Sequence, residues 1–93
     1  MRQLHAIVHG HVQGVSFRYN AQIEAQRLNL AGWVRNLPDH TVETLAVGDP
    51  QALEAYLRWL KNGPTGARVT RVDETWSDSP ETYTTFEIRH GEY

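Results

Sequence analysis

Residues 4–28 read LHAIVHGHVQGVSFRYNAQIEAQRL, and the order of elements in this segment indicates the class of fold. The segment begins with strand-forming residues that end at Gly10, and a second glycine follows at Gly14. From residue 17 to about residue 28, apolar side chains recur at helical spacing between polar ones, with Ser16 as a candidate N-cap. The apolar positions are Phe17, Ala21, Ala25 and Leu28. The segment therefore predicts a strand, a glycine loop and an amphipathic helix.

The middle of the chain predicts a hairpin and a second helix. Residues 32–37 and 41–47 form two β-prone runs around a Pro-Asp-His turn. Asp49 and Pro50 then mark a helix start, with Asp as N-cap and Pro at the first helical position. The apolar face of this helix is Leu53, Tyr56, Leu57 and Leu60, and the helix is expected to end at Asn62-Gly63-Pro64.

Two further strands, over about residues 69–76 and 84–89, flank an expected polar turn at residues 77–80. The order β-α-β-β-α-β with a short extra strand is typical of the ferredoxin-like split βαβ sandwich. This is an α+β fold with two helices on one face of an antiparallel sheet. Because 93 residues without a linker suit one domain and not two, we expect a single domain over residues 1–93.

The composition excludes several classes of protein. Apolar residues make up 40% of the chain and charged residues 22%, and no apolar run approaches the roughly 18 residues of a membrane span. The lack of cysteine excludes a disulfide scaffold, a thiolate nucleophile and a cysteine-containing zinc site. The N-terminus has neither an apolar signal core nor a transit-peptide pattern, so the sequence predicts a cytoplasmic protein without membrane contact.

Charge is distributed unevenly along the chain. Residues 1–36 carry four arginines against the single acid Glu24, whereas residues 37–93 carry five basic and ten acidic side chains. The first of these segments would therefore hold an anion more readily. Lys61 is the only lysine and the arginines are dispersed, so no nucleic-acid partner is expected. The sequence has no evident coiled-coil seam and no long apolar stretch, so we expect a monomer.

The glycine loop is the first candidate for a site. It places successive backbone N–H groups beside a helix N-terminus, which carries about half a positive charge and can bind an anion. Arg18, in the first turn of that helix, could reach back and grip phosphate through two N–H groups. The alternative is that Gly10 and Gly14 only form a turn and Arg18 is solvated, because short glycine motifs often arise by chance.

Asn36 is the second candidate. A right-handed crossover makes the first two predicted strands parallel, so the glycine loop and Asn36 lie at the same edge of the sheet. Ligands of α/β units bind outside the carboxyl ends of strands. The alternative is that Asn36 bonds locally to the following turn.

Metal chemistry and acid/base chemistry are not expected. His9 and His11 are the closest pair of histidines, but the glycine between them breaks the strand and no carboxylate is near them in sequence. Asp73 and Glu74 are neighbours on a strand and should point to opposite faces of the sheet. The remaining histidines are expected at the surface or at sheet edges: His5, His40 and His90.

Two segments resemble the signatures of the acylphosphatase family. Residues 8–18, VHGHVQGVSFR, are similar to its first signature. Residues 32–36, GWVRN, with Val42 and Gly48 downstream, are similar to its second, and residues 63–72, GPTGARVTRV, resemble a weaker third block. Two long signatures in the right order are far more specific than one glycine motif, and the resemblance spans nearly the whole chain.

The resemblance implies a hydrolase that cleaves the carboxyl-phosphate bond of a small acyl phosphate to a carboxylate and inorganic phosphate, without a metal or other cofactor. It implies that Arg18 grips the phosphate oxygens and that Asn36 orients the attacking water. Because phosphoryl transfer has a loose transition state, few protein groups are needed, and we expect the water's proton to pass to the phosphate. The phosphate-binding residues implied are His11, Val12, Gln13, Gly14, Val15, Ser16, Phe17 and Arg18.

One position departs from the family pattern, because His40 stands where the family has glycine. We expect His40 in a left-handed turn conformation that costs roughly 1 kcal/mol, which bears on the hairpin next to Asn36. Two other functions stay open: an anion-binding module without turnover, and a ferredoxin-like domain that binds nucleic acid or protein. The joint presence of Arg18 and Asn36 in their motifs favours the hydrolase.

Overall fold

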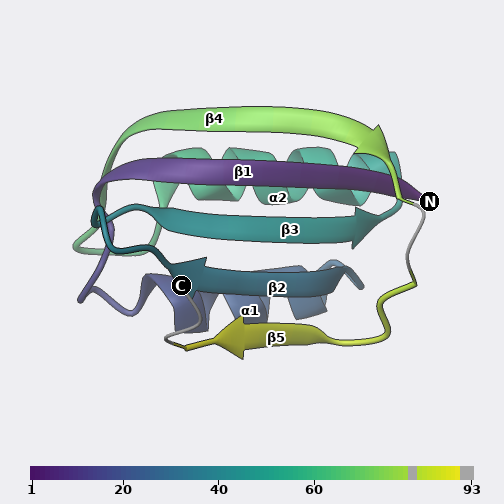
Figure 1. The fold of residues 1–93 in the computed structure, drawn as a ribbon, viewed down its shortest axis with the longest axis horizontal. Coiled ribbons are helices and arrows are strands. Elements are labelled where there is room, and N and C mark those ends of the chain that lie inside the picture. Colours follow the sequence, from purple (N-terminus) through teal and green to yellow (C-terminus); the bar gives the residue numbers. More distant parts are fainter. Residues whose placement is uncertain (80–81, 91–93) are drawn as a thin grey trace.

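A computed structural model describes residues 1–79 and 82–90 of the chain. Figure 1 shows one sheet with both helices on the same face. The arrangement is the ferredoxin-like α+β fold that the sequence predicts. Its elements are, in order, β1 (Arg2–His11), α1 (Phe17–Arg27), β2 (Ala31–Asn36), β3 (Val42–Gly48), α2 (Pro50–Asn62), β4 (Arg68–Asp78) and β5 (Phe86–Arg89).

The sheet has the strand order β4-β1-β3-β2-β5. β3 pairs antiparallel with both β1 and β2, so these two strands run in the same direction, as predicted. The short strand β5 pairs parallel with β2, which makes the sheet mixed and not, as the sequence pattern predicted, purely antiparallel. The carboxyl ends of β1, β2 and β5 therefore meet at one end of the sheet, at the left in Figure 1.

The core lies between the sheet and the helices. α1 packs against β2 and β5, and α2 packs against β4 and β1. Along β1, alternate residues point toward the helices, which is the period of a half-buried strand. Both predicted apolar helix faces are confirmed, apart from Leu28, which is only partly buried. The buried members are Phe17, Ala21 and Ala25 of α1 and Leu53, Tyr56, Leu57 and Leu60 of α2.

Aromatic side chains of α2 pack within this core and form hydrogen bonds there. The Tyr56 hydroxyl donates to Thr44 Oγ1 at 2.9 Å, because the single Thr44 hydroxyl proton is donated to the carbonyl oxygen of Trp33 at 2.8 Å. Burial raises the pKa of Tyr56 far above its ordinary value. The Trp59 ring lies 5.3 Å from that of Phe17 and stacks on Tyr56, so it extends the apolar face of α2 toward α1.

Two local expectations need correction. Ser16 is the N-cap residue of α1, but its side chain makes no capping bond because its backbone is left-handed, with φ of 58°. Ser77 and Asp78, expected in a turn, instead belong to β4, because they pair with β1. Pro80, the last residue of that expected turn, lies outside the described residues. Within the described ranges, neither helix is long and apolar enough to cross a membrane.

Candidate active site

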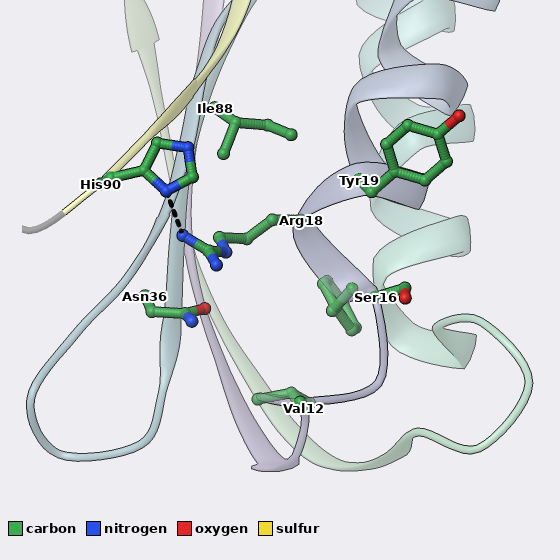
Figure 2. Close-up of a pocket in the computed structure, with 9 residues that line it drawn as sticks. Val12, Ser16, Arg18, Tyr19, Asn36, Ile88 and His90 are labelled. Atoms are coloured by element: carbon green, nitrogen blue, oxygen red, sulfur yellow. Dashed lines mark hydrogen bonds between the residues drawn. The ribbon is translucent and has the colours of Figure 1, made fainter.

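A cleft of about 420 Å³ opens where the carboxyl ends of β1, β2 and β5 meet the start of α1. Figure 2 shows Arg18 extending from α1 toward Asn36 and His90, whereas the Tyr19 ring points away from them. The glycine loop after β1 and Asn36 at the end of β2 meet here, as predicted from the sequence. The cleft is lined by Val12, Gly14, Ser16, Phe17, Arg18, Tyr19, Asn36, Ile88 and His90.

The glycine loop begins at an irregularity in the sheet. The register between β1 and β4 shifts at Gly10, whose φ is 127°, and the chain leaves the sheet after His11. Gly14, with φ of 78°, and Ser16 are also left-handed. Within residues 1–79 and 82–90, no amide of residues 12–16 donates a hydrogen bond to another backbone group. The loop therefore offers a row of N–H groups that have no backbone acceptor in the described part of the chain and lie beside the N-terminus of α1.

The side chain of Gln13 connects this loop to the β2–β3 hairpin. Its Nε2 donates to the carbonyl oxygens of Leu37 and Thr41, each at 2.9 Å. Both carbonyls also accept backbone hydrogen bonds within the hairpin. Gln13 thus fixes the distance between the loop and the strand end that carries Asn36.

Asn36 is the last residue of β2, and its side-chain oxygen Oδ1 is buried without a hydrogen-bond partner among the described residues. A local bond to the turn, the alternative considered above, does not satisfy this atom. The turn is satisfied by Asp39, whose Oδ1 accepts from the Thr41 hydroxyl and amide and whose pKa is lowered by these bonds. An unpartnered buried oxygen costs free energy and indicates a ligand that completes it.

Arg18 is held through one nitrogen of its guanidinium, Nη1. Nη1 donates to the carbonyl oxygen of Arg89 at 3.4 Å and lies 3.2 Å from Nδ1 of His90. Nε and Nη2 have no partner among the described residues. These two nitrogens form one edge of the planar fork, which suits two oxygens of a phosphate.

His40 has φ of 72°, so the expected left-handed conformation is confirmed. The hairpin nevertheless closes: the His40 amide donates to Leu37 O at 3.2 Å, and the Leu37 amide donates to Thr41 O at 2.9 Å. The left-handed His40 is therefore accommodated in the turn next to Asn36.

The cleft includes most of the site residues proposed from sequence, but not all. His11, Gln13 and Val15 do not line it. His9 bonds to Asp73 across the sheet, and no group of three or more potential metal ligands occurs in the part of the chain that the structure describes. Sequence reasoning missed Tyr19, Ile88 and His90. No spacing in the sequence indicated the last two, because only the parallel pairing of β5 with β2 brings them to the cleft.

The acylphosphatase family model matches residues 4–88. The chain belongs to the acylphosphatase family. An acylphosphatase of Thermococcus kodakarensis is 48% identical over 84 residues, which are 90% of this chain and 91% of that relative. The crystal structure of an acylphosphatase from Bacillus subtilis superposes with a TM-score of 0.93 at 45% identity, covering 96% of this chain and 99% of that one. An acylphosphatase structure from Coxiella burnetii gives 0.89 at 37% identity, covering 94% and 90%. The acylphosphatase fold thus accounts for nearly all of this chain.

Proposed function

We propose that residues 1–93 act as a single acylphosphatase domain, a hydrolase that cleaves the carboxyl-phosphate bond of a small acyl phosphate to a carboxylate and inorganic phosphate. The observation that carries this proposal is one cleft that holds both the buried Oδ1 of Asn36 and the Nε–Nη2 edge of the Arg18 guanidinium, neither of which has a partner among the described residues. This reaction requires a hydrogen-bond acceptor that orients water, here Asn36 Oδ1, and a cationic donor that binds phosphate, here the Arg18 guanidinium. The cleft is the acylphosphatase active site in this proposal.

The loop and Arg18 bind the transferred phosphate. The amides of residues 12–16 donate to its oxygens, and Nε and Nη2 of Arg18, which have no partner among the described residues, form two charge-assisted hydrogen bonds to it. Charge in the loose transition state is spread over the equatorial oxygens of the phosphate. Donors that are already fixed around these oxygens stabilise that charge better than water does around a phosphate in solution. No cofactor is required for this step, and Arg18 is the principal cationic group.

Asn36 positions the water. Its Oδ1 accepts a hydrogen bond from the water, so the lone pair of the water oxygen faces phosphorus in line with the leaving carboxylate. The new bond joins the water oxygen to phosphorus, and the bond from phosphorus to the acyl oxygen breaks. The carboxylate leaves with the electron pair of that bond and needs no proton.

The water's proton passes to a phosphate oxygen in this mechanism. The ionisable side chains that line the cleft are Arg18, Tyr19 and His90, and no carboxylate of the described residues joins them. Asn36 does not titrate, so it orients the water without taking its proton. Inorganic phosphate is then released from the loop. We also propose that the protein acts as a monomer in the cytoplasm.

The test is hydrolysis of benzoyl phosphate in EDTA, followed by its ultraviolet absorbance. Arg18→Ala is compared with Arg27→Ala, which removes an exposed arginine of the same helix that pairs with Glu24. Asn36→Ala is compared with Asn62→Ala, at the exposed end of α2. Circular dichroism establishes that each variant is folded.

We expect wild type and both controls to hydrolyse the substrate in EDTA. Arg18→Ala and Asn36→Ala should each lower kcat/KM by about 100-fold or more, because each removes a group that acts in the transition state. Binding of phosphate without turnover by folded wild type would identify an anion-binding module instead. Activity that EDTA abolishes and a metal restores would contradict the metal-free mechanism.

A further inference from the structure

His90 follows directly after β5 and lies against the side chain that is proposed to bind phosphate. Its Nδ1 is 3.2 Å from Nη1 of Arg18, and Figure 2 shows this bond crossing from the end of β5 to α1. A guanidinium has only N–H donors, so Nδ1 must be the acceptor and must carry a lone pair. The bond therefore requires a neutral ring with its proton on Nε2.

The bond uses Nη1 and not the edge of the Arg18 guanidinium that is proposed to bind phosphate. Nη1 has two N–H groups, and the two acceptors found are Nδ1 of His90 and the carbonyl oxygen of Arg89. Nε and Nη2 remain for two phosphate oxygens. Because a long arginine side chain loses much conformational freedom when it is fixed, a second acceptor that holds Nη1 lowers the entropy lost on binding phosphate.

We propose that His90 is a positioning residue that holds Arg18 in its phosphate-binding orientation only while the imidazole is neutral, so that acid weakens the active site. This inference rests on the proposed function. A proton on Nδ1 removes the acceptor and places a positive charge beside the guanidinium. Imidazole is the side chain that normally changes charge between about pH 5 and pH 8, and this general range sets the pH range of the test.

The groups around His90 are cationic. Arg18 faces the ring from α1, Arg89 precedes it on β5, and Arg35 of β2 lines the shallow groove that His90 and Arg89 share. No described acidic side chain lines either that groove or the cleft. A protonated ring would thus have no anionic partner among the described residues and would repel Arg18.

The effect is distinct from general base catalysis. Nδ1 is occupied by Arg18, so it is not the atom that removes a proton from water. Asparagine separates the two roles, because its Oδ1 occupies the position of Nδ1 on Cγ and accepts a hydrogen bond, but it neither titrates nor acts as a base. His90→Asn is therefore the informative substitution, and His90→Ala removes the acceptor altogether.

The test measures kcat/KM for benzoyl phosphate from about pH 5.5 to about pH 8 in wild type, His90→Asn and His90→Ala. Ratios of variant to wild type at each pH cancel the titration of the substrate. His9→Gln serves as control, because His9 bonds Asp73 on the open face of the sheet.

We expect kcat/KM of wild type to fall about tenfold toward acid, and kcat/KM of His90→Asn to stay within about twofold across the range. His90→Ala should have a kcat/KM about tenfold below that of wild type at the upper pH. Coinciding profiles of wild type and His90→Asn would overturn the proposal, as would a loss of about 100-fold in His90→Asn, which would indicate a base.

Two measurements are independent of turnover, so they separate failure of this proposal from failure of the proposed function. Nitrogen NMR of the His90 ring should show the Nε2–H tautomer in wild type and a mixture of tautomers in Arg18→Ala. Sulfate, which keeps its charge across this pH range, should bind wild type more weakly in acid and His90→Asn equally at all pH values. Tighter sulfate binding in acid that disappears in His90→Asn would show that His90 itself is a cationic ligand, and would overturn the positioning role.

Discussion

The side-chain amide of Gln13 donates a hydrogen bond of 2.9 Å to the carbonyl oxygen of Leu37, the residue that follows Asn36. A second bond of equal length reaches Thr41 on the other side of the hairpin. The loop that is proposed to hold phosphate and the strand end that is proposed to hold water are thus connected through one side chain. Their relative position is set within the protein before any substrate binds.

Gln13→Ala should lower activity more than stability. Both carbonyls keep a backbone donor, so the free energy of unfolding should fall by only about 1 to 2 kcal/mol. kcat should fall by about tenfold or more, because the water and the phosphate lose their fixed separation. Benzoyl phosphate kinetics and urea unfolding measure the two effects, with Gln26→Ala on the exposed face of α1 as control. Unchanged kcat with reduced stability would limit Gln13 to a structural role.

Gly10 and Gly14 should respond differently to alanine. At Gly10 a Cβ atom would lie 2.0 Å from the carbonyl oxygen of Arg68, so backbone must move, and we expect a loss of roughly 2 kcal/mol or more. At Gly14 a Cβ would meet nothing within 4 Å, and only the left-handed strain of about 1 kcal/mol remains. Urea unfolding of the two variants tests this order. Equal losses of stability in the two variants would show that the close contact between a Cβ at residue 10 and the Arg68 carbonyl is unimportant.

Glu43 should contribute to the acid sensitivity of folding. Burial alone would raise its pKa, but hydrogen bonds from His5 at 2.7 Å and Arg35 at 2.6 Å outweigh burial and lower it. A lowered pKa in the folded state means that this stabilisation is present above the ordinary Glu range and is lost as pH falls through the folded value. Glu43→Gln should therefore cost about 2 kcal/mol at neutral pH and much less near about pH 3.

Asp73→Asn is the matched control for Glu43→Gln in these unfolding measurements. Asp73 also pairs with a histidine and an arginine, and its pKa is also lowered, chiefly by its bond to His9. Its side chain is 53% exposed, against 14% for Glu43, so water screens its interactions and the loss should be smaller. A loss in Asp73→Asn as large as in Glu43→Gln would contradict this argument.

Tyr56→Phe should separate the role of the hydroxyl from that of the ring. Loss of the bond to Thr44 should cost about 1 kcal/mol at neutral pH. Because burial raises the pKa of Tyr56, the folded state keeps the proton longer than the unfolded state, and wild type should lose stability as pH rises above about 10. Tyr56→Phe should lose less over the same alkaline range. A parallel decline in both proteins would assign the alkaline loss to other groups.

Most elements were predictable because their signals are local. The helical spacing of Phe17, Ala21 and Ala25 and the Asp49-Pro50 start each depend on residues within a few positions of one another. The roles of Gln13 and His90 could not be predicted. Gln13 bonds to residues 24 and 28 positions away, and His90 lies 72 positions from Arg18, so both contacts exist only once the strands are paired.

The parallel pairing of β5 shows the same limit. The composition of residues 84–89 indicated a strand, but four residues from Phe86 to Arg89 do not specify which neighbour they choose or in which direction. In the folded protein β5 also packs against α1, and these contacts include the bond from Gln22 to the carbonyl oxygen of Phe86. With β5 in place, the cleft gains Ile88 and His90, which no motif in the sequence had indicated.

Hydrolysis in ¹⁸O-labelled water tests the central claim most directly, namely that this cleft directs water to the phosphorus of an acyl phosphate. Wild-type protein is given benzoyl phosphate in EDTA, and both products are analysed by mass spectrometry. If Asn36 orients the water toward phosphorus beside Arg18, the label enters inorganic phosphate and the benzoate stays unlabelled. Label in the benzoate would show attack at the carbonyl carbon, and it would contradict the mechanism, as would hydrolysis no faster than without protein.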